Sequence, residues 1–597
     1  NSNKNIYIIT ADDIKNRGIT NIFDVFKITP GAIARDWTGG GKKGSIDLRG
    51  QGEAANNNIL ILIDGVSINP IDMSGPDYSQ ISIEQIDRIE ILPGGGGILY
   101  GDKAIGGVIN IITKSAKETD VKASAKLEFG SYNFFNKGFD LNYKSQNFSV
   151  LAAYYHKNFD GYRENSEHNA HNANLKFNFN ITDYLKSSYS IHYNKDDYGL
   201  PGALTYAQMQ ANRRQSINPL DNVHTKNIRQ IFGLKFKNGN FAIDNNLSYY
   251  IQKIQNEIVS WYGFGFGFGN EKIDNKKIAN HLTFKFEKNR EKLIAGIDYQ
   301  NSNSETNNAN KIKKENLGLY ILNNYRILEN LAFSVGGRKE KTELTYYANN
   351  KQKKYDEDIY EAGLNYYFNN DANVYFNISE NYRTPVTDEY YTWGAYLENL
   401  EPQKGTNIEL GLRAKLKEKY NFFVSAYTNA TEKEIFYNPT TWANDNMPGK
   451  TKREGIEFLS EQQFTENITA RQSYSRIYAK FSDGPYKDKK VPGVPNNIFS
   501  YEVLTKFPKL VNVLINYYYA DGCYPISDFT NSSGKTESYS VVNLNFNKQI
   551  NNLIFNCGIN NIFNEKYSQY IVVDYGFGKN YYPSPERNYY ANISYKF

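Results

Sequence analysis

The sequence has few of the residues on which most enzymes and disulfide-rich proteins depend. Its 597 residues include two cysteines, three methionines and six histidines. Cys523 falls in an expected loop and Cys557 in an expected strand, which indicates two free thiols and excludes a disulfide framework. The histidines are scattered, and no nucleophile motif or metal-ligand spacing accompanies them. The sequence therefore predicts a protein that is not an enzyme and holds no intrinsic cofactor or metal.

Long apolar runs and long basic runs are also missing. The mean hydropathy is −0.64, and no stretch of about 18 uncharged apolar residues occurs, which argues against a membrane-spanning helix. A transmembrane β-barrel remains compatible with this value, because its strands alternate apolar and polar residues. The net charge of +5 is small for this length, so we expect no nucleic-acid partner. The N-terminal stretch NSNKNIYIIT has no signal-peptide pattern, and we expect that such a peptide was removed or lies upstream.

Tyrosine and phenylalanine are abundant instead, with 50 and 35 residues. Tyrosine combines an apolar ring with a polar hydroxyl. This suits β-strands, membrane–water boundaries and loops that contact a ligand.

The chain up to about residue 118 mixes helix and strand patterns. Residues 10–31 predict a helix, with Thr10 as N-cap and Pro30-Gly31 after its end. Residues 59–69 predict a short buried strand that is broken by a tight Asp64-Gly65 turn. Residues 82–92 predict a capped helical turn that runs into another strand. We therefore expect residues 1–118 to form an α+β domain.

Residues 119–597 read as long alternating strands. In residues 121–129 the apolar side chains, beginning with Val121, share one face, and the polar ones, beginning with Lys122, share the other. Short polar turns recur near Lys144, Ile181, Lys237, Glu287, Arg326, Asn369, Lys417, Phe464, Lys506 and Lys548. These turns, about ten in all, predict about eleven hairpins and roughly 22 antiparallel strands.

Long insertions separate the expected hairpins, for example residues 195–222 and 380–405. Short turns on one rim and long loops on the other are typical of an outer-membrane barrel. A soluble β-propeller or solenoid would also contain many short strands, but it does not explain an aromatic face suited to lipid. A barrel this wide leaves an open lumen. The predicted fold is therefore an all-β transmembrane barrel, and something must fill its lumen.

Four consecutive glycines, Gly94–Gly97, follow Pro93. A phosphate-binding loop would need a Lys-Ser/Thr pair after the glycines, and none is present. We interpret the stretch as a tight turn in a packed domain, because glycine allows positive φ and close backbone approach.

Four motifs in the first domain resemble, in order and spacing, the plug signature of the TonB-dependent outer-membrane receptors. They are Ile46–Gly52, Leu60–Asn69, Ile86–Leu92 and Tyr100–Lys114. Four further segments are similar to the barrel of that family: Asn381–Tyr391, Glu398–Leu412, Asn560–Tyr567 and Pro583–Phe597. The family usually has Arg-Gly-Pro where this chain has Pro93 and Gly94–Gly97.

The resemblance implies that the N-terminal α+β domain fills the lumen of the all-β barrel as a plug. It also implies an active importer in the outer membrane of a Gram-negative bacterium. It would capture a scarce solute that is too large for porins and release it inward when TonB pulls the plug. The family's TonB box lies upstream of the element that begins here at Ile6, and only Asn1–Asn5 precede it. We therefore expect coupling to TonB, with ExbB and ExbD, through a box not present in this chain. Outer-membrane lipid and lipopolysaccharide are the other expected partners.

The resemblance places the ligand site above the plug, between its apices and the long loops. Plug candidates are Asp36, Trp37, Lys42, Lys43, Met73, Asp77 and Tyr78. Loop candidates are Tyr198, Arg213, Arg214, Trp261, Tyr262, Arg383, Tyr390 and Trp393. Expected structural and gating residues are Arg49, Asp64, Gly65, Arg88, Glu90, Gly101, Gly106 and Gly107. Arg49, Arg88 and Glu90 are candidates for charged contacts with the barrel wall, and the three later glycines are expected to let plug strands pass close together.

The expected cargo is a metal chelate, first a ferric siderophore or a ferric-citrate-like complex. Tryptophans in the loops suit a planar or apolar chelate, and Arg213, Arg214 and Arg383 suit its carboxylates. Residues 199–222 look like ferric-citrate receptors, whereas residues 62–80 are similar to cobalamin receptors, so cobalamin is the alternative. Haem is the third candidate and is disfavoured, because the plug has no histidine. Asp196-Asp197 is too sparse for a calcium cluster. A surface adhesin or phage-docking barrel would use the same loops but would not need a complete plug.

Overall fold

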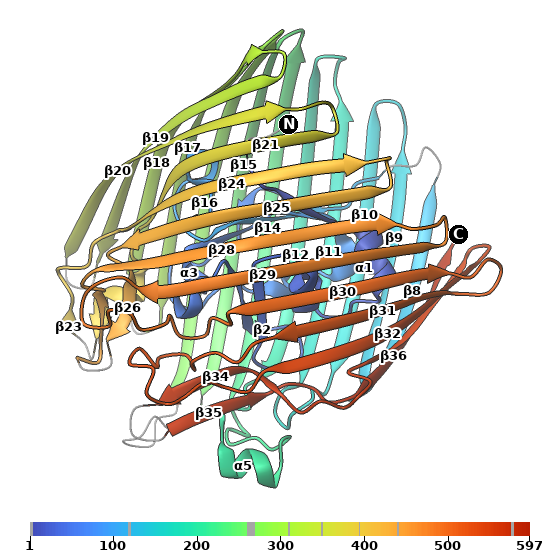
Figure 1. Cartoon of the computed structure of the whole chain (residues 1–597), viewed down its shortest axis with the longest axis vertical. Coiled ribbons are helices and arrows are strands. Elements are labelled where there is room, and N and C mark those ends of the chain that lie inside the picture. The colour runs from blue at the N-terminus through green and yellow to red at the C-terminus, as the bar shows by residue number, and fades with distance from the viewer. Residues whose placement is uncertain are drawn as a thin grey trace.

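The computed structural model describes residues 4–116, 121–258, 269–307, 311–347, 350–392, 395–438, 441–574 and 578–597. The N-terminal elements, drawn in blue in Figure 1, lie inside a barrel formed by the rest of the chain. None of the helices in these ranges is long and apolar enough to cross a membrane.

The plug contains a five-stranded sheet in the order β1-β6-β7-β4-β5, in which only the β4–β7 pair is parallel. The strands of the plug, including β2 and β3 outside this sheet, are β1 (Tyr7–Thr10), β2 (Ala32–Asp36), β3 (Gly44–Leu48), β4 (Ile59–Ile63), β5 (Val66–Ser67), β6 (Ile86–Pro93) and β7 (Gly107–Thr113). Its helices are α1 (Ala11–Arg17), α2 (Ile22–Val25), α3 (Ala55–Asn58) and α4 (Gly97–Tyr100), with 3-10 turns η1 (Phe26–Ile28), η2 (Gly52–Ala54), η3 (Tyr78–Gln80) and η4 (Ile83–Gln85). The expected Asp64-Gly65 turn joins β4 to β5, and the expected helical turn precedes β6.

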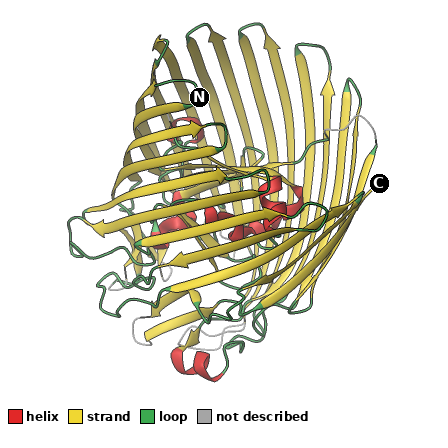
Figure 2. Cartoon of the chain, turned by 45° about the vertical axis from the view of Figure 1, so that its right-hand side comes forward, coloured by secondary structure: helices red, strands yellow, loops and turns green. Residues whose placement is uncertain are grey.

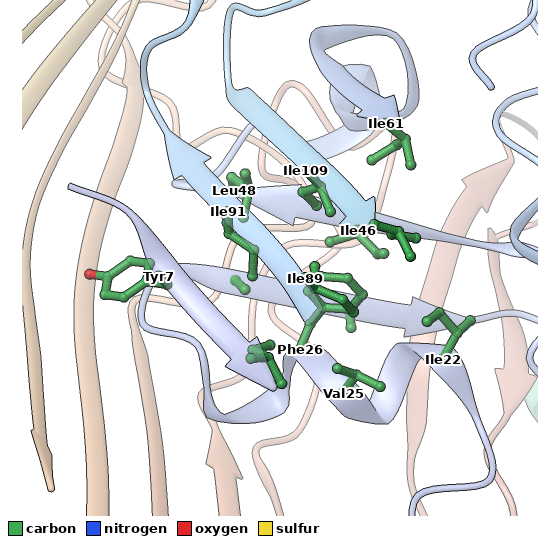
Figure 3. Packing of buried hydrophobic residues seen from close by; sticks show 14 of the residues in the cluster. Tyr7, Ile22, Val25, Phe26, Ile46, Leu48, Ile61, Ile89, Ile91 and Ile109 are labelled. Atoms are coloured by element: carbon green, nitrogen blue, oxygen red, sulfur yellow. The ribbon is translucent and has the colours of Figure 1, made fainter. Parts of the chain in front are cut away.

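Isoleucine and phenylalanine side chains form the plug core. Figure 3 shows Val25 and Phe26 packing beneath the sheet residues Ile89 and Ile91, with Ile109 of the neighbouring strand beside them. These side chains are at most 1% exposed. The burial of each contributes about 1.5–3 kcal/mol, so the plug has a hydrophobic core of its own.

The single helix expected over residues 10–31 is wrong. Thr10 does cap α1 and accepts a hydrogen bond from the Asp13 amide, but the helix ends at Gly18, where φ is 58°. A Cβ on Gly18 would lie 2.1 Å from the Tyr590 hydroxyl oxygen of the wall. The chain therefore turns at this glycine and starts the separate helix α2 after Asn21.

The barrel is closed and has 22 strands, which confirms the predicted fold. The strands are β8 (Lys122–Gly130), β9 (Phe134–Lys144), β10 (Phe148–Phe159), β11 (His168–Asn180), β12 (Leu185–Gly199), β14 (Asn222–Asn238), β15 (Phe241–Ile258), β16 (Gly269–Lys288), β17 (Glu291–Thr306), β18 (Lys311–Leu328), β19 (Leu331–Tyr346), β20 (Lys351–Tyr367), β21 (Ala372–Arg383), β24 (Gln403–Leu416), β25 (Tyr420–Glu432), β28 (Lys450–Gln463), β29 (Ile468–Phe481), β30 (Asn497–Lys506), β31 (Asn512–Ala520), β32 (Tyr539–Ile550), β33 (Leu553–Asn560) and β36 (Asn588–Lys596). Neighbours pair antiparallel, and the last strand closes the barrel by pairing with the first, with Ala591 opposite Phe129.

All ten predicted short turns fall between consecutive barrel strands, for example between β9 and β10 and between β32 and β33. They form one rim, which we call the short-turn rim, and the remaining connections, which include the long loops, form the opposite, long-loop rim. The expected alternation also holds: Phe129 is 52% exposed on the outer face, whereas its neighbour Glu128 is 1% exposed and points into the lumen.

Small elements decorate the long-loop rim. They are β13 (Leu204–Thr205), α5 (Tyr206–Ala211), η5 (Thr387–Tyr390), β22 (Tyr391–Thr392), β23 (Ala395–Tyr396), β26 (Ile435–Asn438), β27 (Ala443–Asn446), β34 (Ser568–Asp574) and β35 (Gly578–Pro583). Figure 2 shows the plug helices enclosed by strands, while α5 lies apart from them beyond this rim, at the bottom of the view. Strand β13 pairs with β35, so loops far apart in sequence meet here.

Candidate functional site

An apical loop, residues 36–44 between β2 and β3, points from the plug toward the long-loop rim. The Asp36 carboxylate accepts hydrogen bonds from the backbone amides of Thr38, Gly39 and Gly41, at 3.1, 2.9 and 2.9 Å. Burial outweighs these bonds and raises the pKa of Asp36 above its ordinary value. Asp36 therefore shapes the loop from within.

Trp37 connects this loop to a long barrel loop. Its ring lies 4.9 Å from the Tyr570 ring in β34, centroid to centroid. The backbone amide of Asp36 donates to the Gln569 side chain at 3.1 Å. The Trp37 indole N–H is buried and has no hydrogen-bond partner among the described residues. Such a donor is available to a ligand that enters between the two segments.

Lys42 fixes the plug apices to the barrel wall. Its ammonium lies 2.7 Å from an oxygen of Asp77 in the plug and 2.8 Å from an oxygen of Asp196 in β12. The Tyr198 ring lies below it at 4.7 Å. Burial opposes ionisation of Asp77, but the Lys42 ammonium and the Ser79 hydrogen bonds outweigh it and hold the pKa of Asp77 below its ordinary value. Lys42, Asp77 and Tyr198 thus form an attachment point.

Met73 is the predicted plug residue that is most available to a ligand, with 45% of its surface exposed. Its sulfur lies 3.8 Å from the Asn444 side-chain nitrogen, which comes from the hairpin β26–β27. The half-buried Lys43 donates to the Ser74 carbonyl at 3.4 Å, a long hydrogen bond. Both side chains lie at the mouth of the plug.

Three further predicted ligand residues are also buried, like Asp36, Lys42, Asp77 and Tyr198. Tyr78 is 3% exposed in the plug core, and its ring packs against Phe23 at 5.0 Å. Arg383 forms two hydrogen bonds with the Glu389 carboxylate, at 2.8 and 3.0 Å. Tyr390 is fully buried and bonds to the Tyr355 hydroxyl. In this conformation they hold the core and a long loop, so they do not enter our proposal for the ligand site.

Arg213 and Arg214 lie beside a cavity of about 540 Å³ under α5 at the long-loop rim. Arg213 donates to the Tyr567 carbonyl at 2.8 Å, and Arg214 donates to the Tyr162 carbonyl at 2.7 Å. The lining also includes Tyr206, Lys535, Tyr539, Lys566, Lys579 and Tyr581, together with three glutamates.

The three lysines of this cavity were not among the predicted site residues. They come from loops between β31 and β36, far along the chain from α5, and only the folded barrel brings them together. The excess of tyrosine in the composition indicated the tyrosine rings of the lining, but no sequence signal indicated these lysines. The predicted residues Trp261, Tyr262 and Trp393 lie outside the described residues.

Arg49 makes the expected charged contact between plug and wall. Its guanidinium donates to Glu409 in β24 at 2.8 Å and to Glu457 in β28 at 2.9 and 2.8 Å. The Tyr427 ring lies 4.1 Å from the guanidinium carbon. Arg49 is 1% exposed. Three barrel strands thus hold one plug side chain.

The same expectation for Arg88 and Glu90 is wrong. Arg88 pairs with Glu90 at 2.8 Å and with Asp87 at 3.2 Å, and all three lie on plug strand β6. The Arg88 side chain is 41% exposed. Alternation along β6 points Arg88 and Glu90 to the face opposite the buried Ile89 and Ile91.

The plug glycines and Asp64 mark close approaches. At Gly107, φ is 135°, and a Cβ would lie 2.3 Å from the Leu92 carbonyl oxygen of the adjacent strand, as expected. Gly106 lies against the Gln51 side chain, whereas Gly101 faces Glu340 of the wall and not a plug strand. The Asp64 carboxylate accepts from the Thr113 amide at 2.8 Å, which holds the β4–β5 turn against β7.

Three comparisons place these features among known proteins. Residues 115–562 match the family model for the TonB-dependent receptor-like β-barrel, and residues 1–108 match that for the TonB-dependent receptor plug domain. The chain is 23% identical to the vitamin B12 transporter BtuB of Vibrio vulnificus, over 99% of this chain and 92% of that protein.

Solved structures agree on the fold. The chain matches the unliganded ferric citrate transporter FecA with a TM-score of 0.85 and 18% identity, over 100% of this chain and 97% of that one. It matches the ferric yersiniabactin uptake receptor FyuA of Yersinia pestis with a TM-score of 0.85 and 15% identity, over 100% and 98%. At these identities the likeness shows the fold alone.

A closed barrel whose lumen is filled by a plug defines a gated receptor of the outer membrane. The chain belongs to the TonB-dependent receptor family, whose members lie in the outer membrane of Gram-negative bacteria. Proteins of this family are transporters and receptors, not enzymes.

Proposed function

We propose that the protein imports a metal chelate, first a ferric siderophore or ferric-citrate-like complex, with residues 1–118 as the gate and residues 119–597 as the pore. The observation that carries the proposal is the cavity of about 540 Å³ at the long-loop rim. It places Arg213, Arg214 and three lysines beside tyrosine rings. Cations can bind the carboxylates of a ferric chelate, and the rings can contact its apolar parts.

The structure supports a path inward from this cavity. Arg213 contacts the Tyr567 carbonyl, and the ring of Tyr570 in the same segment packs against Trp37 of the plug. The segment that holds Tyr567 and Tyr570 thus connects the outer cavity to the apical loop. Transport then requires that the ion pairs of Lys42 and Arg49 with the wall break, since both hold the plug in place. Energy for this step would come through TonB, and lipopolysaccharide would surround the outer rim.

Cobalamin is the second candidate cargo. The relative from Vibrio vulnificus that covers the chain almost completely carries a name that assigns it to vitamin B12. Arg383 is also occupied by Glu389, which leaves fewer cations for an anionic chelate than the sequence predicts. A less charged ligand would fit this reduced set.

The test is a binding titration followed by tryptophan fluorescence, together with metal and mass analysis of any ligand retained on purification. Ferric citrate, a ferric catecholate, a ferric hydroxamate, haem and cyanocobalamin are titrated separately. We expect one ferric chelate to quench the tryptophan fluorescence with a submicromolar Kd. Loss of a charge-assisted hydrogen bond costs about 1.5–3 kcal/mol, so Arg213→Gln/Arg214→Gln should weaken binding at least about tenfold.

Arg326→Gln is the matched control, because Arg326 is exposed beside a turn of the opposite rim. This variant should bind as the unaltered protein does. Quenching by cyanocobalamin alone would refute the ferric proposal and select the second candidate. Ferric binding that is unchanged in the double variant would refute the cavity as the site.

A further inference from the structure

A second cavity, of about 400 Å³, lies between the plug and one side of the barrel wall. The plug contributes the β4–β5 turn, residues 66–71 and residues 99–103, and the wall contributes strands β15–β19. It is separate from the outer cavity under α5. We call it the wall cavity.

Most charged side chains of the wall cavity have partners of opposite sign. The pairs are Lys314–Asp102 at 2.6 Å, Arg338–Asp298 at 2.7 Å, Arg338–Glu340 at 2.5 Å, His281–Asp298 at 2.8 Å, Lys176–Asp64 at 3.4 Å and Lys285–Asp244. Each carboxylate of the lining therefore already faces a cation.

Lys103 and Lys277 are the exceptions. Each is 6% exposed, and among the described residues neither has a carboxylate within ion-pair distance. The Lys103 ammonium donates to the Pro70 carbonyl at 2.7 Å. The Lys277 ammonium donates to the carbonyls of Ser67 and Asn69, at 3.1 and 3.2 Å. The two ammonium groups thus reach the same short plug segment, and neutral carbonyls do not cancel their charge.

A third buried cation increases the imbalance. Arg229 in β14 is 2% exposed and donates to the Gln80 side chain, but its Nε and Nη1 have no hydrogen-bond partner in the described part of the chain. Arg229 and Lys277 approach the same Tyr250 ring, at 5.7 and 5.9 Å from its centroid. Burial, and then the Lys314 ammonium, lower the pKa of Lys103 to about 7. A buried charge without a partner is costly, and an anion would remove that cost.

We propose that the wall cavity is an oxyanion site, in which Lys103 and Lys277 together bind a carboxylate, sulfate or phosphate group. Each ammonium has three donors and uses one or two of them on the plug carbonyls, so donors remain for a ligand. The oxyanion is either a free inorganic ion or an anionic group of the cargo on its way past the plug. The second source rests on the proposed function, and the first does not.

The direct test uses the full chain in detergent without cargo. Sulfate is titrated at constant ionic strength against chloride, and crystals are soaked in selenate, whose selenium gives an anomalous signal. We expect saturable sulfate binding and a selenium peak between the two lysine ammonium groups. Lys103→Gln/Lys277→Gln should weaken sulfate binding at least about tenfold, because two charge-assisted contacts are lost.

Lys285→Gln is the matched control, since Lys285 lines the same cavity but pairs with Asp244. It should retain both the binding and the peak. If the unaltered protein binds no sulfate and shows no selenium peak, the site does not exist and the lysines are held neutral. If the double variant binds sulfate as tightly as the unaltered protein does, Lys103 and Lys277 do not form the site.

Uptake by cells distinguishes the two sources of the anion. Ferric citrate, which carries carboxylates, is compared with a ferric hydroxamate that has no free carboxylate. Slower uptake of ferric citrate alone by the double variant, with unchanged affinity at the outer cavity, assigns the site to the cargo. Loss of sulfate binding with unchanged uptake of both assigns it to a free ion. If no ferric chelate binds at all, the proposed cargo fails while the sulfate result still stands.

Discussion

At the scale of single residues, Arg49 is the side chain whose removal should most weaken the attachment of the plug. Arg49→Met leaves Glu409 and Glu457 buried without their cation. Breaking one side of a buried ion pair costs about 3–5 kcal/mol. The plug should therefore unfold at lower urea concentration than in the unaltered protein, as measured by protection of plug peptides from hydrogen exchange.

Arg88→Met is the control for Arg49→Met. Arg88 also pairs with carboxylates, but its own side chain is half-exposed. Such pairs are worth about 0–1 kcal/mol, so protection should hardly change. Adding Glu457→Gln to Arg49→Met should recover part of the loss, since one uncompensated charge is removed. Equal effects of Arg49→Met and Arg88→Met would contradict the role we give Arg49.

Gly107→Ala tests the close approach of β6 and β7. The new Cβ would meet the backbone oxygen of Leu92, which cannot rotate away, and the positive φ of 135° adds strain. Strain of this kind alone costs on the order of 1–3 kcal/mol. Gly65→Ala is the comparison, because φ is also positive there, at 81°, but nothing lies within 4 Å of the added carbon. The urea midpoint of plug unfolding should fall much further for Gly107→Ala, and a larger fall for Gly65→Ala would refute the steric argument.

Residue types predict a role more readily than they predict a partner. Arg49 lies within the plug motif Ile46–Gly52, so its contact with the wall could be expected. Its partners Glu409 and Glu457 lie hundreds of residues away, and only the register of the closed barrel selects them. Tyr78 and Arg383 also lie within segments that resemble receptors of this family, yet whether such a side chain points to a ligand or into the core depends on loop conformation. No sequence signal indicates that Lys103 and Lys277 line the same cavity, because their proximity depends on how the plug is rotated inside the barrel.

At the scale of elements, the apical loop should detach in acid. The pKa of Asp77 is held below its ordinary value, so its ion pair with Lys42 is stable above the ordinary carboxylate pKa of about 3.9 and is lost as pH falls below it. Asp36 acts in the opposite direction, because its raised pKa means that protonation favours the folded loop. Detachment below about pH 4 therefore reports on Asp77 and Asp196, the two carboxylates that hold Lys42, and not on Asp36.

Trp37 can follow this detachment in a protein whose other three tryptophans are replaced by phenylalanine. Its emission should stay constant from about pH 8 to pH 4 and shift to longer wavelength below pH 4, when the ring contact with Tyr570 opens. Lys42→Met should show the shifted emission already at neutral pH, because Asp77 and Asp196 then lack their cation. A transition near pH 6 in the unaltered protein would assign the attachment to some other group.

Elements of the barrel were easier to predict than those of the plug. Strand alternation and polar turns repeat many times along residues 119–597, so every short turn could be located. Residues 10–31 carry apolar side chains at helical spacing, and the pattern does not reveal that Gly18 ends the helix against Tyr590. Tertiary contact decides that boundary.

At the scale of the whole molecule, the plug should be the only obstacle in the pore. The register between β36 and β8 involves no plug residue, so a variant without residues 1–116 should still close its barrel. A barrel of 22 strands encloses a wide lumen. Single-channel recordings in planar bilayers should show a large steady conductance for this variant and almost none for the full chain. A deletion variant that inserts with the heat-modifiable gel mobility of a folded barrel but conducts no current would contradict the plug's role.

The pairing of the first barrel strand with the last also means that the barrel can close only after the whole chain has been synthesised. While the chain is being made and delivered, β8 presents a row of unpaired amides and carbonyls that nothing can cover until β36 arrives. Every other strand finds a neighbour made just before it. A chain that lacks its last strands therefore keeps two sheet edges with unpaired amides and carbonyls, and such edges are prone to pair with other chains.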